Sequence, residues 1–442
     1  MRDRNQIKKN REITYRETKR KRRKRRQMHL FFTVFLCVMG IGGIVLGTIY
    51  MLQMRQEKKV PVTNITEEVK EKVTEDEPEK VDPFGITNEE KESEELTEQT
   101  GKYADILADA EKMMQENIYE KEPAVPGEIT MTFTGDVMFD DNYSIMSTYK
   151  AAGKDVSGCM SEDLLEQMRS SDILMLNNEC TFTTRGEPTP GKTYTFRCNP
   201  ENVKVLQDIG ADIVSLANNH AYDYGEISLL DTLDTLRSAD VPYVGAGKNI
   251  EEASKPVYFI AGDIKVAVLS ATQIERVDNP DTKGATENAA GVFRCRDPKA
   301  LCDAIAKAKE NSDYVIVYVH WGTENETTID WAQRDQAPLY AEAGADLIIG
   351  DHPHCLQGIT YVENTPVIYS LGNFWFNSKT IDTGMLKATF DENGLKNLQF
   401  IPCLQANCRT VLLNGNEKER VLQTMRELSP NVTIDTEGYV NR

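Results

Sequence analysis

From residue 128 onward, short apolar runs alternate with longer segments whose apolar positions recur at helical spacing. The short runs predict strands, and the periodic segments predict amphipathic helices. The predicted strands are 129–134, 172–177, 212–217, 257–260, 266–270, 314–320, 347–350 and 367–371. The predicted helices are 161–169, 201–208, 226–238, 297–310 and 331–343, with further strands and a helix at 416–428 beyond residue 384. This alternation indicates an α/β domain, and roughly 300 residues suffice for one large core.

The hydrophobic pattern differs upstream. Residues 29–52 are apolar, with no charged residue after His29, and they follow a run of Lys and Arg at 19–26. At ~1.5 Å per residue this stretch can cross a hydrocarbon core of ~30 Å, and its basic flank favours the cytoplasmic side. It is longer than the ~7–15 apolar residues of a cleaved signal peptide. We therefore expect a single-pass cell-membrane protein, with a cytoplasmic tail at 1–28, a transmembrane signal-anchor at 29–52 and an extracellular C-terminal domain.

Residues 53–127 are rich in Glu, Lys and Thr and poor in large apolar residues, which is typical of a solvated stalk. Helical spacing over 103–119 indicates a short helix there. The domain is then expected at 128–442. Residues 1–27 carry 14 Lys/Arg against 3 Asp/Glu, a net charge of +11, whereas the whole chain is at −19, so the remainder carries −30. Because nucleic-acid binding needs a basic surface, this charge excludes it for the domain, while the basic tail suits anionic lipid.

The nine cysteines are scattered and form no C-x-x-C motif. Three pairs are close in sequence, Cys180/Cys198, Cys295/Cys302 and Cys403/Cys408, and an exported domain can form disulfides. Free thiols remain an equal alternative, because sequence alone does not fix connectivity.

The candidate chemistry lies at the ends of the predicted strands. Four of the five histidines, His220, His320, His352 and His354, each follow a predicted strand, and so do the carboxylates Asp136 and Glu179 and the amide Asn219. Ligands of open α/β sheets bind outside the carboxyl ends of the strands, so these side chains are expected to meet. Carboxylate, amide and imidazole donors suit one or two divalent ions, with Mn, Zn or Fe expected. Pro353 between two histidines favours an extended backbone at His352 and places both rings on one side.

These residues sit in a recognisable series of motifs, so the region 128–385 resembles the CapA family of capsule-synthesis proteins associated with poly-γ-glutamate. That family is itself similar to the calcineurin-like metallophosphoesterases. The resemblance implies a metallophosphoesterase-like layered α/β sandwich. The motifs that carry it are Gly135-Asp136-Val137-Met138, Asn178-Glu179, Asn218-Asn219-His220, His320-Trp321-Gly322-Thr323-Glu324, Gly350-Asp351-His352-Pro353-His354 and Gly372-Asn373-Phe374.

The resemblance also implies roles for the residues that match. Asp136, Glu179 and His354 would hold one metal ion. Glu179 would be shared with a second ion, whose other ligands would be Asn219, His320 and His352. His220 matches the residue that assists the leaving group. Asp351 is expected to be a hydrogen-bonding partner rather than a ligand.

Two departures from the phosphoesterase pattern bear on this site. Met138 stands where that pattern has the histidine of D-x-H, so the first ion loses a ligand, since a thioether suits hard ions poorly. Glu179 is one methylene longer than the expected Asp. Both departures are usual in CapA-like proteins.

The function implied by the resemblance is the synthesis, export or anchoring of a capsular polymer, through metal-dependent hydrolysis or transfer. The polymer, or another anionic surface polymer, and membrane capsule-synthesis subunits are the expected partners. Candidate substrate-binding residues are Lys192, Arg197, Glu324 and Asn373. Two alternatives remain open: a non-catalytic assembly or export scaffold, and a general extracellular metallophosphoesterase.

Overall fold

The computed structural model describes residues 101–275 and 282–442. Within these ranges no helix is both long and apolar enough to cross a membrane. The predicted localisation, a single-pass protein of the cell membrane with an extracellular domain, is therefore corrected, because no described helix provides such a span. The predicted tail, the predicted transmembrane helix at 29–52 and the first part of the predicted stalk lie outside the described residues.

The domain contains mixed α/β sheets. The first has seven strands in the order β1-β9-β10-β12-β13-β15-β14. The neighbours β10, β12, β13 and β15 run parallel, whereas β9 pairs antiparallel to β10 and parallel to β1, and β14 pairs antiparallel to β15. The bounds are β1 Ile118–Glu120, β9 Val257–Ala261, β10 Ile264–Thr272, β12 Tyr314–His320, β13 Leu347–Asp351, β14 Ile359–Val362 and β15 Thr365–Ile368.

The second sheet has eight strands, in the order β19-β18-β17-β2-β3-β6-β7 with β16 also paired to β2. Strands β2, β3, β6 and β7 run parallel, and β17, β18 and β19 extend the sheet antiparallel. The bounds are β2 Glu128–Val137, β3 Ile173–Asn178, β6 Ile213–Ser215, β7 Tyr243–Val244, β16 Asn373–Trp375, β17 Ile381–Asp391, β18 Gly394–Ala406 and β19 Arg409–Leu412.

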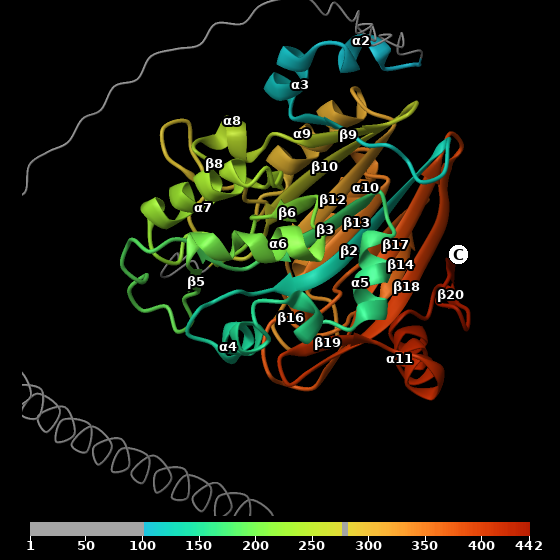
Figure 1. Ribbon diagram of the computed structural model, residues 1–442. Helices are drawn as coiled ribbons and strands as arrows, with labels where there is room; N and C mark the ends of the chain where they lie inside the picture. The colour runs from blue at the N-terminus through green and yellow to red at the C-terminus, as the bar shows by residue number, and fades with distance from the viewer. Residues whose placement is uncertain (1–100, 276–281) are drawn as a thin grey trace, which may run out of the picture. The chain divides into compact units, whose positions relative to one another are not determined.

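Helices cover the outer faces of both sheets. On the second sheet, α4 Ser144–Ala151, α5 Glu162–Arg169, α6 Lys204–Ile209 and α7 Glu226–Ser238 contribute to one apolar cluster, and Figure 1 shows α6 and α7 alongside β3 and β6. On the first sheet, α9 Lys299–Lys309 and α10 Trp331–Glu342 belong to another. The remaining elements are α2 Ala104–Leu107, α3 Ala110–Glu116, α8 Ile250–Ala253, α11 Gly415–Leu428, two 3-10 turns at Val156–Gly158 and Pro200–Val203, β4 Thr181–Phe182, β5 Arg197–Cys198, β8 Ala246–Gly247, β11 Gly291–Val292, β20 Thr433–Ile434 and β21 Val440–Asn441.

The central core lies between the two sheets. Ile316 and Tyr318 of β12 share an apolar cluster with Met131 and Phe133 of β2. The alternate residues of β12, including Val317, pack under the helices instead. A strand buried on both faces has no polar side, which explains why β12 reads as a continuous apolar run.

Upstream of residue 128 the chain already belongs to this domain. The helix predicted over 103–119 is two short helices, α2 and α3, and Asp109 caps the second by accepting a hydrogen bond from Lys112 N. Strand β1 then pairs with β9 at the edge of the first sheet. The described domain therefore includes residues 101–127, the last part of the stretch that the composition predicts as stalk.

The cysteines of the described residues are free thiols. Cys180, Cys198, Cys295 and Cys403 are buried, and burial raises the pKa of Cys295 to about 12. None of the three sequence-adjacent pairs forms a disulfide in this structure.

Candidate metal centre

The predicted site residues come together at the carboxyl ends of parallel strands from both sheets. Asp136 lies near the end of β2, and Glu179 directly follows β3. His320 ends β12, and Asp351 ends β13 as its register partner. Because parallel strands bring their carboxyl ends to one edge, residues more than 200 positions apart in sequence meet there.

Three carboxylates form the buried base of the site: Asp136, Glu179 and Asp351 are each fully buried. The Asn177 amide nitrogen donates to Asp136 Oδ1 over 2.9 Å and to Glu179 Oε1 over 3.0 Å. Asn177 was not among the predicted site residues. It lies two positions before Glu179, which is the spacing at which strand residues share a face.

The histidines close the site on the other side. His320 Nε2 lies 2.8 Å from Asn219 Oδ1 and 3.0 Å from His352 Nδ1. His354 Nδ1 lies 3.0 Å from Asp136 Oδ2 and 2.8 Å from Asn373 Oδ1. Asp136, Glu179 and His320 each offer one ligand atom within 4.8 Å of the others, the spacing that one metal ion requires.

Burial and mutual repulsion set the protonation of the acids. Burial, followed by the charge of Asp136, raises the pKa of Glu179 and of Asp351 well above the usual range. Burial also opposes ionisation of Asp136, but the hydrogen bond and charge of His354 outweigh it and lower its pKa. Without a bound cation, Glu179 and Asp351 therefore favour their protonated forms, and a cation would favour their charged forms.

The imidazoles at the centre are neutral. Burial lowers the pKa of His320 to about 3, and burial together with His320 lowers that of His352. Metal binding requires the neutral imidazole, so both rings are in the competent form. His354 differs, because its hydrogen bond to Asp136 outweighs burial and raises its pKa.

The donor set fits a divalent cation. Glu179 Oε2 and Asp351 Oδ2 are buried and have no hydrogen-bond partner among the described residues. A buried carboxylate oxygen without a partner is costly, and a cation is the simplest group that satisfies it. Clustered carboxylates and neutral imidazoles are also the ligands that Mn, Zn and Fe accept.

The backbone at the two closing histidines differs from the prediction. His352 has φ of 93° and His354 has φ of 59°, so His352 is not extended. Positive φ values at non-glycine residues cost about 1–3 kcal/mol each and cluster at functional sites. The rings nevertheless face the same site, with centroids 5.7 Å apart.

His220 lies beside the carboxylates in a buried chain of charges. Its Nδ1 is 2.7 Å from Asp223 Oδ2, and its Nε2 is 3.8 Å from Glu179 Oε2. Lys192 Nζ lies 2.6 Å from Asp223 Oδ1, and the Lys192 side chain is only 5% exposed. Lys192 was predicted as a substrate-binding residue, yet its ammonium is already paired with Asp223. Asp223 was missed, although its position three residues after His220 was an available signal.

The other predicted substrate residues lie at different depths. The Arg197 guanidinium lies over the Tyr224 ring, 4.4 Å from its centroid. Glu324 is exposed, and its negative charge contributes to the raised pKa of His354. Asn373 is buried, with its Oδ1 2.8 Å from His354 Nδ1. Met138 is buried in the apolar cluster under α4 and α5, away from any ligand role.

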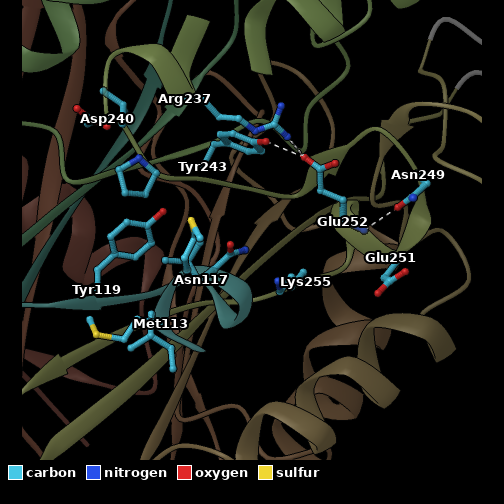
Figure 2. Close-up of a pocket in the computed structure, with 15 residues that line it drawn as sticks. Met113, Asn117, Tyr119, Arg237, Asp240, Tyr243, Asn249, Glu251, Glu252 and Lys255 are labelled. Atoms are coloured by element: carbon cyan, nitrogen blue, oxygen red, sulfur yellow. Dashed lines mark hydrogen bonds and ion pairs between the residues drawn. The ribbon is translucent and has the colours of Figure 1, made fainter. Parts of the chain in front are cut away.

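A separate cavity of about 740 Å³ lies between the α3–β1 segment and the region around α7 and α8 (Figure 2). None of the predicted site residues lines it. Its Glu252 carboxylate accepts hydrogen bonds from Arg237 and from the Tyr243 hydroxyl, so these charges pair with one another.

Fold and site together define a mixed α/β protein with a buried acid–imidazole cluster. Residues 130–378 match the family described as bacterial capsule synthesis protein PGA_cap. The match covers more than half of the chain, and the chain therefore belongs to this capsule-synthesis family, as the motifs predicted.

Two relatives support the assignment. The PGA biosynthesis protein CapA of Bacillus subtilis (strain 168) is 31% identical over 281 residues, which cover 62% of this chain and 71% of that protein. The capsule biosynthesis protein CapA of Bacillus anthracis is 29% identical over 310 residues, covering 67% and 73% respectively.

Among solved structures, a proposed 5'-nucleotidase from Staphylococcus aureus in complex with alpha-ketoglutarate aligns with a TM-score of 0.36 at 15% identity, covering 68% of this chain and 58% of that chain. The 5'-nucleotidase from Candida albicans SC5314 aligns with a TM-score of 0.33 at 10% identity, covering 64% and 53%. These scores are low, and no conclusion about fold or activity rests on them.

Proposed function

We propose that this protein acts on a capsular polymer, with poly-γ-glutamate as the leading candidate, through metal-dependent hydrolysis or transfer in the synthesis, export or anchoring of that polymer. One observation carries the proposal: three fully buried carboxylates share a site with neutral imidazoles. A site of this composition is costly to keep without a cation. Family membership supplies the polymer pathway, and the chemistry is inferred from the site.

The fold proposed for this chemistry is a metallophosphoesterase-like sandwich. Two sheets packed face to face, helices on the outer faces and ligands at the strand ends support it. The residues that would hold one or two divalent ions are Asp136, Glu179, Asn219, His320, His352 and His354. A bound ion supplies Lewis acidity and lowers the pKa of a coordinated water.

His220 is the proposed proton-transfer group: burial lowers the pKa of its imidazole, so the neutral ring takes a proton from the attacking water on Nε2 and passes it to the leaving group. Asp223 accepts a hydrogen bond from Nδ1, which leaves Nε2 on the side of Glu179. The Phe196 ring packs 4.3 Å from the imidazole and restricts its rotation and its access to water. A fixed ring that presents one nitrogen to the reacting group is the arrangement that general acid catalysis requires.

The test uses the purified full-length chain with added Mn²⁺. We expect release of glutamate or short oligomers from poly-γ-glutamate, or hydrolysis of a generic phosphoester, and a loss of at least about 100-fold in His220→Ala, since general acid–base groups contribute about 10²–10⁴-fold. Exposed Glu310→Gln provides the control and should keep wild-type activity. Equal rates in wild type and His220→Ala would exclude the proposed role of His220.

A non-catalytic assembly role remains the second candidate, and the burial of Met138 favours it. The position that carries a ligand in phosphoesterases here belongs to the hydrophobic core. Cells that carry His220→Ala and still make normal capsule would support this alternative. Loss of capsule with wild-type protein levels would support catalysis.

A further inference from the structure

The first of the two implied ion sites lacks a ligand. Strand β2 supplies Asp136, but Met138, two positions later, packs into the core. Asp136, Glu179 and His354 alone would leave an ion with three protein donors. A residue elsewhere in the fold is needed to fill the gap.

Asp351 is placed to fill it. It ends β13, lies opposite His320 in the register of the parallel pair, and is fully buried. Its Oδ1 lies 2.9 Å from His320 Nδ1. Asp136 lies close to the same ring, because the Asn177 amide nitrogen is 2.9 Å from Asp136 Oδ1 and 3.4 Å from His320 Nδ1. The side chain therefore connects the His320 side of the site with the Asp136 side.

The second oxygen of Asp351 has no partner. Oδ2 is buried and accepts no hydrogen bond among the described residues. The nearby Tyr318 hydroxyl donates to Thr134 O, over 2.7 Å, and also lies close enough to Asp351 to lower its pKa. A buried carboxylate oxygen that accepts no hydrogen bond is available to bind a cation.

We propose that Asp351 is a further metal ligand, which completes the ion site of Asp136, Glu179 and His354 in place of the histidine absent at position 138. Oδ1 accepts from His320 Nδ1–H, which would leave His320 Nε2 to hold the other ion, and Oδ2 would hold the first. This inference rests on the proposed function, because it presupposes a metal centre. An oxygen donor in place of an imidazole makes the first site harder, so it should favour Mn²⁺ over Zn²⁺ more than an imidazole-rich site would.

The alternative is that Asp351 only orients His320. Asp351→Asn separates the two roles, because the amide oxygen still accepts from His320 Nδ1–H but carries no charge. If Asp351 only oriented the His320 ring, its loss would weaken the binding of the ion that His320 holds. Loss of a ligand would instead remove the ion held by Asp136 and His354.

The experiment counts Mn²⁺ ions per full-length chain by elemental analysis and calorimetry after the chain has been stripped with a chelator. We expect two ions in wild type, one in Asp351→Asn, one in His354→Ala and one in the double variant of these two, since both remove the same ion. Combination of Asp351→Asn with His320→Ala should leave none. Asp351→Asn should also lose more affinity for Mn²⁺ than for Zn²⁺.

Asp346→Asn is the matched control, because Asp346 directly precedes β13 at its other end and pairs with Lys309 far from the site. If Asp351→Asn does not fold, Asp351→Ser removes the same charge with a smaller side chain. An unchanged number of ions in the folded Asp351 variant overturns this inference and leaves the metal centre standing. No Mn²⁺ in wild type overturns both.

Discussion

At the scale of single residues, the chain Lys192–Asp223–His220 illustrates how burial changes the value of a charge. Asp223 is fully buried and accepts from Phe196 N over 2.6 Å as well as from His220. Lys192 is its only cationic partner among the described residues. In water such a pair contributes little, but removal of one buried partner strands the other charge.

Lys192→Met is therefore expected to cost about 3–5 kcal/mol of unfolding free energy, measured by urea denaturation, because it leaves Asp223 buried without its cation. Lys204→Met is the matched control. The Lys204 side chain is 67% exposed in its pair with Asp208, so its loss should cost less than about 1 kcal/mol. Similar losses of unfolding free energy in the two variants would show that the Lys192–Asp223 pair contributes no more to stability than an exposed ion pair.

At the scale of elements, the hydrophobic pattern predicts regular elements and misses those fixed by distant contacts. Helix α7 and strand β12 have the predicted bounds, because both present a long, uniform pattern to the core. Helix α4 was not predicted. The loop before it is held by a distant contact, in which Asp140 accepts a hydrogen bond from Arg197 N, and the local hydrophobic pattern does not show such a contact. Strands β4 and β5 have two residues each and leave no periodic signal.

The same limit applies to the site. The strand-end residues were predictable because the carboxyl ends of parallel strands share an edge. Asn177 and Asp223 lie at spacings from Glu179 and His220 that permit contact, but spacing alone does not show which polar neighbours make one. The positive φ at His352 overrides the local preference before proline. The roles carried over from the family remain predictions that the proposed metal measurements test.

The attachment of α2 to the domain gives a prediction for pH. Asp313 accepts from Lys102, from the Tyr103 hydroxyl over 2.8 Å and from Lys265 N over 2.8 Å. Burial opposes its ionisation, but these hydrogen bonds outweigh burial and lower the pKa of Asp313. A carboxyl whose pKa is lower in the folded state stabilises above its unfolded pKa of about 3.9, and this stabilisation is lost as pH falls further.

Asp313→Asn should thus destabilise the protein by about 1–3 kcal/mol at pH 7, since hydrogen bonds to charged groups are lost. The difference between variant and wild type should shrink between about pH 4 and pH 2, where wild-type Asp313 is protonated too. Thermal unfolding across this pH range measures it. A difference that is independent of pH would exclude ionisation of Asp313 as the cause.

At the scale of the whole molecule, the candidate centre joins the two sheets. Asp136 and Glu179 belong to the second sheet, whereas His320 and Asp351 belong to the first. The sheets also meet through apolar side chains such as Phe133 and through hydrogen bonds such as that from the Tyr318 hydroxyl to Thr134 O. Without a cation, the clustered carboxylates oppose this packing at its polar edge. Metal binding should therefore stabilise the domain as a whole.

Added Mn²⁺ should raise the thermal midpoint of the chelator-stripped full-length chain. A ligand at 100 times its Kd that binds only the folded state adds about 2.7 kcal/mol, which for a domain of this size corresponds to a rise of a few degrees. His320→Ala removes a ligand of one of the two ions and should reduce the rise by about half, whereas Asp346→Asn, which lies away from the site, should retain the full rise. Excess chelator should reverse the effect in wild type. An equal rise in wild type and His320→Ala would place the stabilising ion elsewhere and remove the support for a metal that joins the sheets.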